Sequence, residues 1–118
     1  MKLKEIRDEE KPLSEQFRLA GEAWAEADGA ANLLAELKSV TLDQRKAQLI
    51  LERGDMPDNK AERIVKSSPS WEEYIRAMVQ ARLEANKLKV AMETIKFRYG
   101  EQQRLDANMR ADMRLSRG

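Results

Sequence analysis

The sequence predicts an all-α fold: an antiparallel helical hairpin with a short helical tip, packed into a dimeric bundle. Charged residues make up 36% of the 118-residue chain and aromatic residues only 5%, a composition typical of long, exposed helices. Two long stretches repeat apolar residues at three- and four-residue steps, as on one face of a helix. Because a lone hairpin buries one stripe per helix, we expect a homo-oligomer, with a dimer favoured.

The stretch 70–116 predicts one long helix of about 70 Å. When the residues are grouped in heptads from Trp71, the apolar positions form a coiled-coil seam of four heptads. The frame shifts near Gly100, which costs about 1 kcal/mol inside a helix. The predicted seam residues of this helix are Trp71, Tyr74, Met78, Leu88, Met92, Ile95 and Tyr99.

Residues 1–12 have mixed charges and few apolar anchors, so we expect a mobile N-terminal arm before a single domain that spans 13–118. The apolar stripe that follows predicts an amphipathic helix over 13–53. Its predicted seam residues are Phe17, Trp24 and Leu34.

A second apolar stripe, displaced from the first, takes over around Lys38. A stutter in a continuous helix explains the displacement. A break between Ser39 and Thr41 explains it too, because Thr41 and Gln44 have the spacing of a capping box. We favour the continuous helix, which matches its partner in length and stops at Gly54. The second stripe consists of Leu33, Leu37, Val40, Gln44, Ala47 and Leu51.

The segment 54–69 is predicted to turn the chain around. Asp55 is placed as the cap of a short helix that begins at Met56. Either Ser68 or Ser70 then caps the long helix, and Glu73 completes a capping box with Ser70.

Catalysis has no support in the residue types. The chain contains no histidine and no cysteine, which removes the usual general base, the commonest metal ligand and any disulfide. The serines between 67 and 70 are explained by capping, and no phosphate-binding glycine loop occurs. We therefore expect no enzymatic activity, no catalytic residue, no cofactor and no metal site.

The sequence disfavours two further classes of protein, membrane-spanning proteins and DNA-binding helix-turn-helix proteins. No run of about 18 apolar residues occurs, so we expect no membrane-spanning segment, and the N-terminus does not match a secretory signal. The stretch 47–65 has the order of a helix-turn-helix motif, but Asp55 and Asp58 in its turn oppose the approach of a phosphate backbone. We favour a simple hairpin tip there.

The charge is distributed unevenly. Residues 1–73 carry 12 basic and 16 acidic residues, whereas 74–118 carry 10 and 5. Five basic residues of the long helix recur at multiples of seven residues and predict a stripe beside the seam. This basic stripe, a candidate for contact with DNA or an acidic partner, consists of Arg82, Lys89, Lys96, Arg110 and Arg117.

Two interpretations of the basic stripe remain open. Its residues either pair within the hairpin with acidic residues such as Glu15, Glu22, Glu36 and Asp43, or form a track for a nucleic-acid backbone or an acidic protein surface. Met109 and Met113, one turn apart near the C-terminus, are a candidate protein-contact patch, because flexible thioether side chains suit adaptable contacts.

The stretch from Ser68, SPSWEEYIRAMVQARLEANKLKVAMETIKFRYGEQQ leading into RADMRL, resembles small helical-hairpin proteins of tailed phages and prophages that are often encoded beside recombination genes. The likeness covers about residues 60–118. It implies a non-enzymatic accessory or inhibitory protein that binds a protein partner in DNA recombination or host defence, in the cytoplasm of an infected or lysogenic bacterium. The alternative is sequence-independent DNA binding along the basic stripe.

Overall fold

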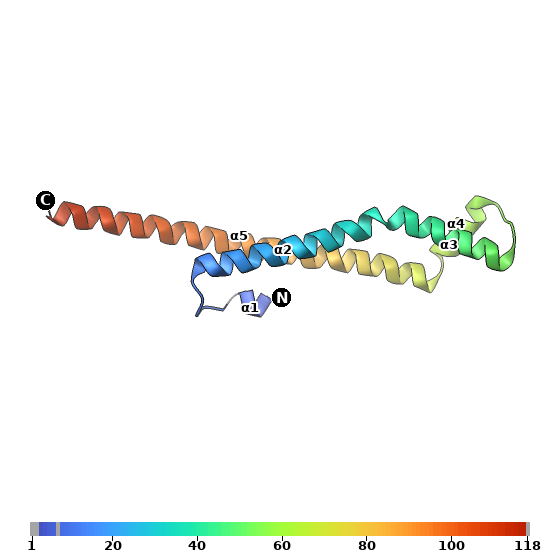
Figure 1. The fold of residues 1–118 in the computed structure, drawn as a ribbon, viewed down its shortest axis with the longest axis horizontal. Coiled ribbons are helices and arrows are strands. Elements are labelled where there is room, and N and C mark those ends of the chain that lie inside the picture. Colours follow the sequence, from blue (N-terminus) through green and yellow to red (C-terminus); the bar gives the residue numbers. More distant parts are fainter. Residues whose placement is uncertain (1–2, 7, 118) are drawn as a thin grey trace. The chain divides into compact units, whose positions relative to one another are not determined.

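A computed structural model describes residues 3–6 and 8–117, and within these ranges every regular element is an α-helix (Figure 1). The prediction of an all-α protein is confirmed. No helix in the described ranges is long and apolar enough to cross a membrane. The helices are α1 (Leu3–Ile6), α2 (Leu13–Glu36), α3 (Lys38–Arg53), α4 (Asp58–Lys66) and α5 (Pro69–Arg117).

The chain divides by its internal contacts into two compact units. The middle unit is residues 27–85, which hold the end of α2, all of α3 and α4, and the start of α5. The terminal unit combines the residues up to Glu26 with those from Asn86 onward. Each unit is described by itself below.

In the middle unit, a single residue separates α2 from α3. Leu37 has φ −81° and ψ −3°, close to helical values. Its N–H donates to the Leu33 carbonyl at 3.0 Å, and its own carbonyl accepts from the Thr41 N–H at 2.8 Å. The hydrogen-bond ladder therefore passes through the junction, and Thr41 lies inside α3 instead of capping a new helix.

The turn after α3 depends on Gly54. Its φ of +92° and ψ of 174° lie in a region that only glycine adopts readily, and its N–H donates to the Ile50 carbonyl at 2.8 Å. The prediction that the tip helix begins at Met56 was wrong. That helix, α4, begins at Asp58, because Pro57 forces the residue before it toward an extended conformation.

Ser68 is the residue that caps α5. Its hydroxyl oxygen accepts a hydrogen bond from the Trp71 N–H at 3.3 Å and donates to the Val65 carbonyl at 2.6 Å. Pro69 then occupies the first helical position, where the missing N–H costs nothing.

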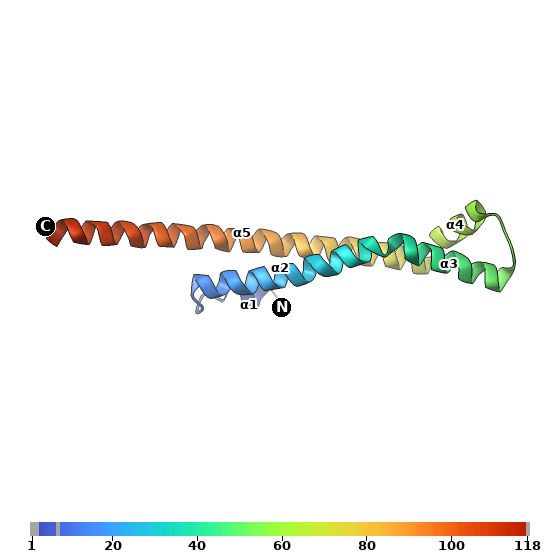
Figure 2. The ribbon, with the colours of Figure 1, turned by 45° about the horizontal axis from the view of Figure 1, so that its top comes forward.

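The core of the middle unit lies where α3, α4 and the start of α5 meet. Figures 1 and 2 show α4 lying beside α3. Trp71 is stacked on Tyr74 with ring centroids 5.5 Å apart, and the Arg45 guanidinium lies over both rings at 5.7 and 5.8 Å. The buried members of the core are Leu49, Ala61, Val65 and Trp71, against which Leu42, Met56, Ile64, Tyr74 and Ile75 pack.

Side-chain hydrogen bonds join α2 to α5 within the middle unit. The Tyr74 hydroxyl donates to the Leu34 carbonyl at 2.5 Å, and Arg82 donates to Asp28 at 2.7 Å. The residue number falls along α2 as it rises along α5. These two segments therefore run antiparallel.

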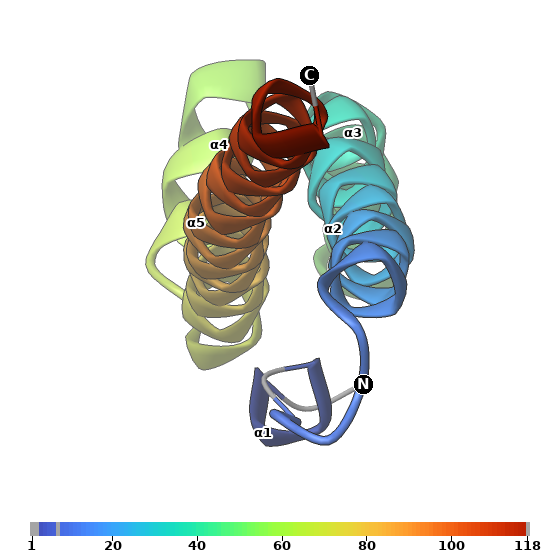
Figure 3. The ribbon, with the colours of Figure 1, turned by 90° about the vertical axis from the view of Figure 1, so that its left-hand side faces the viewer.

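In the terminal unit, α2 and α5 come close at Gly21, where an added Cβ would lie 3.8 Å from the Met92 sulfur. Figure 3 looks along α5 from its C-terminal end, and this part of α2 lies beside it. Ile6 of α1 is fully buried, and the Gln16 side chain donates to the Lys11 carbonyl at 2.8 Å. Whether the arm over 1–12 is mobile stays a prediction. The buried residues on the two long helices of this unit are Gln16, Leu19, Ala20 and Ala23 with Leu88, Ala91 and Ile95.

The second apolar stripe, which takes over around Lys38, faces outward. Leu33, Val40 and Leu51 are 55, 49 and 87% exposed. The face of α3 that packs inward instead carries Leu42 and Leu49. Both faces have helical spacing, and spacing alone does not reveal which of them meets α4.

Candidate interaction surfaces

The basic stripe is divided between the two units, and its residues have different surroundings. Arg82, in the middle unit, is half-buried, and its terminal nitrogens donate to Asp28 Oδ1 at 2.7 Å and to Asn32 Oδ1 at 2.5 Å. Arg82 therefore contributes to packing between α2 and α5.

The other four stripe residues lie on the terminal-unit part of α5 and are exposed. Within the part of the chain that the structure describes, Lys89, Lys96, Arg110 and Arg117 form no ion pair, and Arg110 donates only to the backbone carbonyl of Asp106, at 3.3 Å. Their charges therefore remain available to a ligand.

None of the acidic residues considered as internal partners of the stripe forms an ion pair with a stripe residue in the described ranges. Glu15 and Glu22 both bind Arg18 on their own helix, the latter at 2.8 Å. The hydrogen bond from Arg18 lowers the pKa of Glu15, and Glu15 in turn raises the pKa of Arg18. Asp43 lies 3.7 Å from Lys46. Glu36 makes no ion pair in the described ranges.

An ion pair between Lys46 and Asp58 joins α3 to α4. Lys46 Nζ lies 2.9 Å from Asp58 Oδ1, and the hydrogen bond to Asp58 raises the pKa of Lys46. This pair involves no residue of the basic stripe.

The seam residues of α5 are buried or half-buried as far as Tyr99, and every described residue from Gly100 onward is exposed. The position of α2 explains this boundary. Gly21 lies against Met92. α2 begins at Leu13, eight residues before Gly21. Because the helices run antiparallel, the matching position on α5 is Gly100, eight residues after Met92. Figures 1 and 2 show the C-terminal end of α5 continuing past the start of α2.

The C-terminal segment of α5, residues 101–117, carries the predicted methionine patch. Leu105, Met109 and Met113 are 60, 59 and 56% exposed. They recur every four residues and so form one ridge on the helix surface. Apolar side chains at this exposure on a helix with no neighbour in the terminal unit are typical of a contact surface.

The remaining predicted seam residues fall into two groups by exposure. Trp71, Leu88 and Ile95 are buried. The half-buried group consists of Phe17, Trp24, Leu34, Tyr74, Met78, Met92 and Tyr99.

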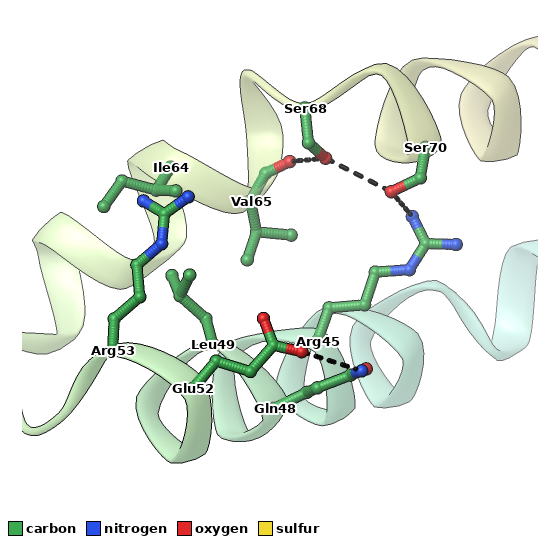
Figure 4. A pocket seen from close by; sticks show the side chains of 9 residues that line it. All are labelled: Arg45, Gln48, Leu49, Glu52, Arg53, Ile64, Val65, Ser68 and Ser70. Atoms are coloured by element: carbon green, nitrogen blue, oxygen red, sulfur yellow. Dashed lines mark hydrogen bonds between the residues drawn. The ribbon is translucent and has the colours of Figure 1, made fainter.

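Sequence reasoning missed an open depression between α3, α4 and the start of α5 (Figure 4). Arg45 reaches across it to the Ser70 hydroxyl at 3.4 Å, and Gln48 donates to Glu52 at 3.3 Å. Because Arg45 already lies over Trp71 and Tyr74, its main role is structural. The sequence signal for this arrangement was Arg45, which is three residues after Leu42 and four before Leu49 and so shares their helical face. The depression is lined by Arg45, Gln48, Leu49, Glu52, Arg53, Ile64, Val65, Ser68 and Ser70.

No three acidic side chains of the described ranges are grouped so that they could hold a metal ion.

Comparison with known proteins found no match: no family model, no curated protein and no solved structure is significantly similar to the chain.

Proposed function

We propose that this chain is a non-enzymatic interaction protein, built as a dimeric antiparallel helical hairpin, that binds a protein partner through the C-terminal segment of α5. One observation carries the proposal. This 17-residue helical segment exposes an apolar ridge, formed by Leu105, Met109 and Met113, that no described residue of the chain covers.

The chemistry of the ridge indicates how it would bind. An amphipathic helix can lay an apolar ridge into a hydrophobic groove of a partner, and methionine side chains adapt to the shape of such a groove. Arg117 lies beside Met109 and Met113, and Arg110 and Arg114 each directly follow one of these methionines in the sequence. These arginines favour a partner whose groove has an acidic rim. The proposed partner is a protein of DNA recombination or host defence, a role supported by the resemblance to phage helical-hairpin proteins.

The hairpin part of the proposal is supported by the order of contacts inside each unit. Leu34 and Asp28 meet Tyr74 and Arg82 in antiparallel order in the middle unit. In the terminal unit α5 loses its neighbour near the position where α2 begins.

Capture from a bacterial lysate with matched variants tests the proposal. Met109→Lys with Met113→Lys places two charges on the ridge, and Ala107→Lys with Ala111→Lys places two on other faces of the same segment. We expect one partner, identified by mass spectrometry, to be retained by wild type and by the alanine-site variant and lost from the methionine-site variant. A set of captured proteins identical for all three would contradict the proposal.

Direct DNA binding is the second candidate, favoured by Lys89 and Lys96, which are exposed and form no ion pair with any described residue. Several such contacts make affinity for a phosphate backbone fall steeply with salt. Fluorescence anisotropy with single- and double-stranded DNA at about 50 and about 200 mM salt tests it. Lys89→Glu with Lys96→Glu would abolish binding at the lower salt, whereas Lys38→Glu with Lys60→Glu, outside α5, would not. Equal losses in both variants would rule out a specific track.

A further inference from the structure

We infer that two copies of the chain pair through the outward-facing stripe of α2 and α3, side by side, parallel and in register. The inference rests on the dimer included in the proposed function and names the surface that forms it. This outer stripe consists of Leu33, Leu37, Val40, Gln44, Ala47 and Leu51, all of them exposed.

The outer stripe is continuous across the helix junction. The backbone hydrogen bonds from Leu37 to Leu33 and from Thr41 to Leu37 maintain the helical ladder there. The six positions therefore follow one another at alternating steps of four and three residues on one helical face. This is the heptad spacing with which two helices interlock their side chains.

Packing within the middle unit does not use the outer stripe. α3 contacts α4 and the start of α5 through Leu42 and Leu49, on another face. Four large aliphatic side chains of the stripe, those of Leu33, Leu37, Val40 and Leu51, remain between 41 and 87% exposed. A row of this size on one helix is more than scattered surface residues account for.

The charges beside the stripe favour a second copy in parallel orientation. Glu36 and Asp43 each directly precede a stripe residue, Leu37 and Gln44. In an antiparallel pair, equivalent flanking positions face each other and would bring these carboxylates together. In a parallel pair, each instead faces the position five residues further along the partner, which places Glu36 near Thr41 and Asp43 near Gln48.

Gln44 would set the register of this pair. It is the only polar residue of the stripe, and a single polar residue in such a seam is satisfied best when it faces its own copy. A shift by one heptad would place each Gln44 amide against Leu37 or Leu51 of the other copy, where its hydrogen bonds are lost.

Single-cysteine variants test the pairing, since the chain has no cysteine of its own. Disulfides form only when the two Cα atoms lie within about 7 Å. We expect mild oxidation to convert Gln44→Cys into a covalent dimer on non-reducing gels, while Ser39→Cys, exposed on another face of α3, stays mostly single-chain. A Gln44→Cys variant that stays single-chain, although sedimentation shows wild type to be a dimer, would overturn the inference and leave the dimer itself intact.

A second pair of variants does not depend on cross-linking. Val40→Glu with Ala47→Glu charges the stripe, and Ala35→Glu with Ser39→Glu adds the same charge on other exposed faces. Sedimentation velocity is expected to show at least about a tenfold weaker dimer for the first variant and no change for the second. Unchanged association of the first variant, or a wild type that is monomeric at about 100 µM, would overturn the inference. Capture of a partner from lysate through the α5 ridge is a separate measurement. Its outcome does not depend on the cross-linking result or on the sedimentation result.

Discussion

Arg82 donates a hydrogen bond to Oδ1 of Asp28 at 2.7 Å, and so joins α5 to α2 within the middle unit. Lys89, seven residues further along α5, is exposed and forms no ion pair in the described ranges. Two members of one basic stripe therefore have different roles. The first joins two helices, and the charge of the second is exposed to solvent.

This difference predicts unequal effects on stability. Arg82→Met should lower the free energy of unfolding by about 1 kcal/mol, since the pair is partly exposed and solvent screens it. Lys89→Met, which removes an equal charge, should change it by less than about 0.5 kcal/mol. Urea denaturation of both variants checks this. Equal losses would show that Lys89 also pairs within the fold.

The two aromatic residues Trp71 and Phe97 form a second matched comparison. Trp71 is 5% exposed and belongs to the core of the middle unit, whereas Phe97 is 68% exposed. Trp71→Ala should cost about 3–5 kcal/mol, the range for removing a buried aromatic side chain. Phe97→Ala should cost less than about 0.5 kcal/mol. A large loss of stability for Phe97→Ala would show that this side chain is covered in the folded protein.

Gly54 and Gly29 are expected to respond in opposite directions to alanine. Gly54→Ala should cost about 1–3 kcal/mol because φ is +92° there. Gly29→Ala should stabilise the protein by about 0.5–1 kcal/mol, since Gly29 lies inside α2 and an added Cβ meets nothing within 4 Å. Thermal melts distinguish the two. A neutral Gly54→Ala variant would contradict the backbone conformation of the turn.

Glu15 links stability to pH. The hydrogen bond from Arg18 lowers its pKa below the ordinary value of 4.5. The stabilising contribution of the carboxylate is therefore present above pH 4.5 and is lost as the pH falls through the lower pKa of the folded protein. The stability of wild type relative to Glu15→Gln should shrink over this range in urea titrations. A difference that stays constant from pH 7 down to about pH 2 would contradict this assignment.

How much of the fold follows from sequence is visible in α5 and α3. In α5, one strong heptad pattern placed Trp71, Leu88 and Ile95 on a single face, and all three are buried. In α3, two faces have helical spacing, so the sequence did not reveal that Leu42 and Leu49 pack inward while Val40 stays exposed. The stacking of Arg45 on Trp71 also escaped prediction, because it joins residues from different helices.

The surfaces proposed for binding were predictable only in part. Seven-residue spacing revealed a basic stripe, but charge pattern alone could not separate Arg82, which meets Asp28, from Lys89, which does not. That distinction depends on which α2 residue lies opposite each position of α5. It required the three-dimensional structure.

The central claim is that α5 beyond Gly100 serves binding and not folding. The most direct test is the free energy of unfolding of the Met109→Lys, Met113→Lys variant, measured in urea beside wild type. We expect a difference of less than about 0.5 kcal/mol, since both side chains are more than half exposed. A loss of about 2 kcal/mol or more, the size expected when buried side chains are disrupted, would show that these methionines belong to the core of the protein and would contradict the account.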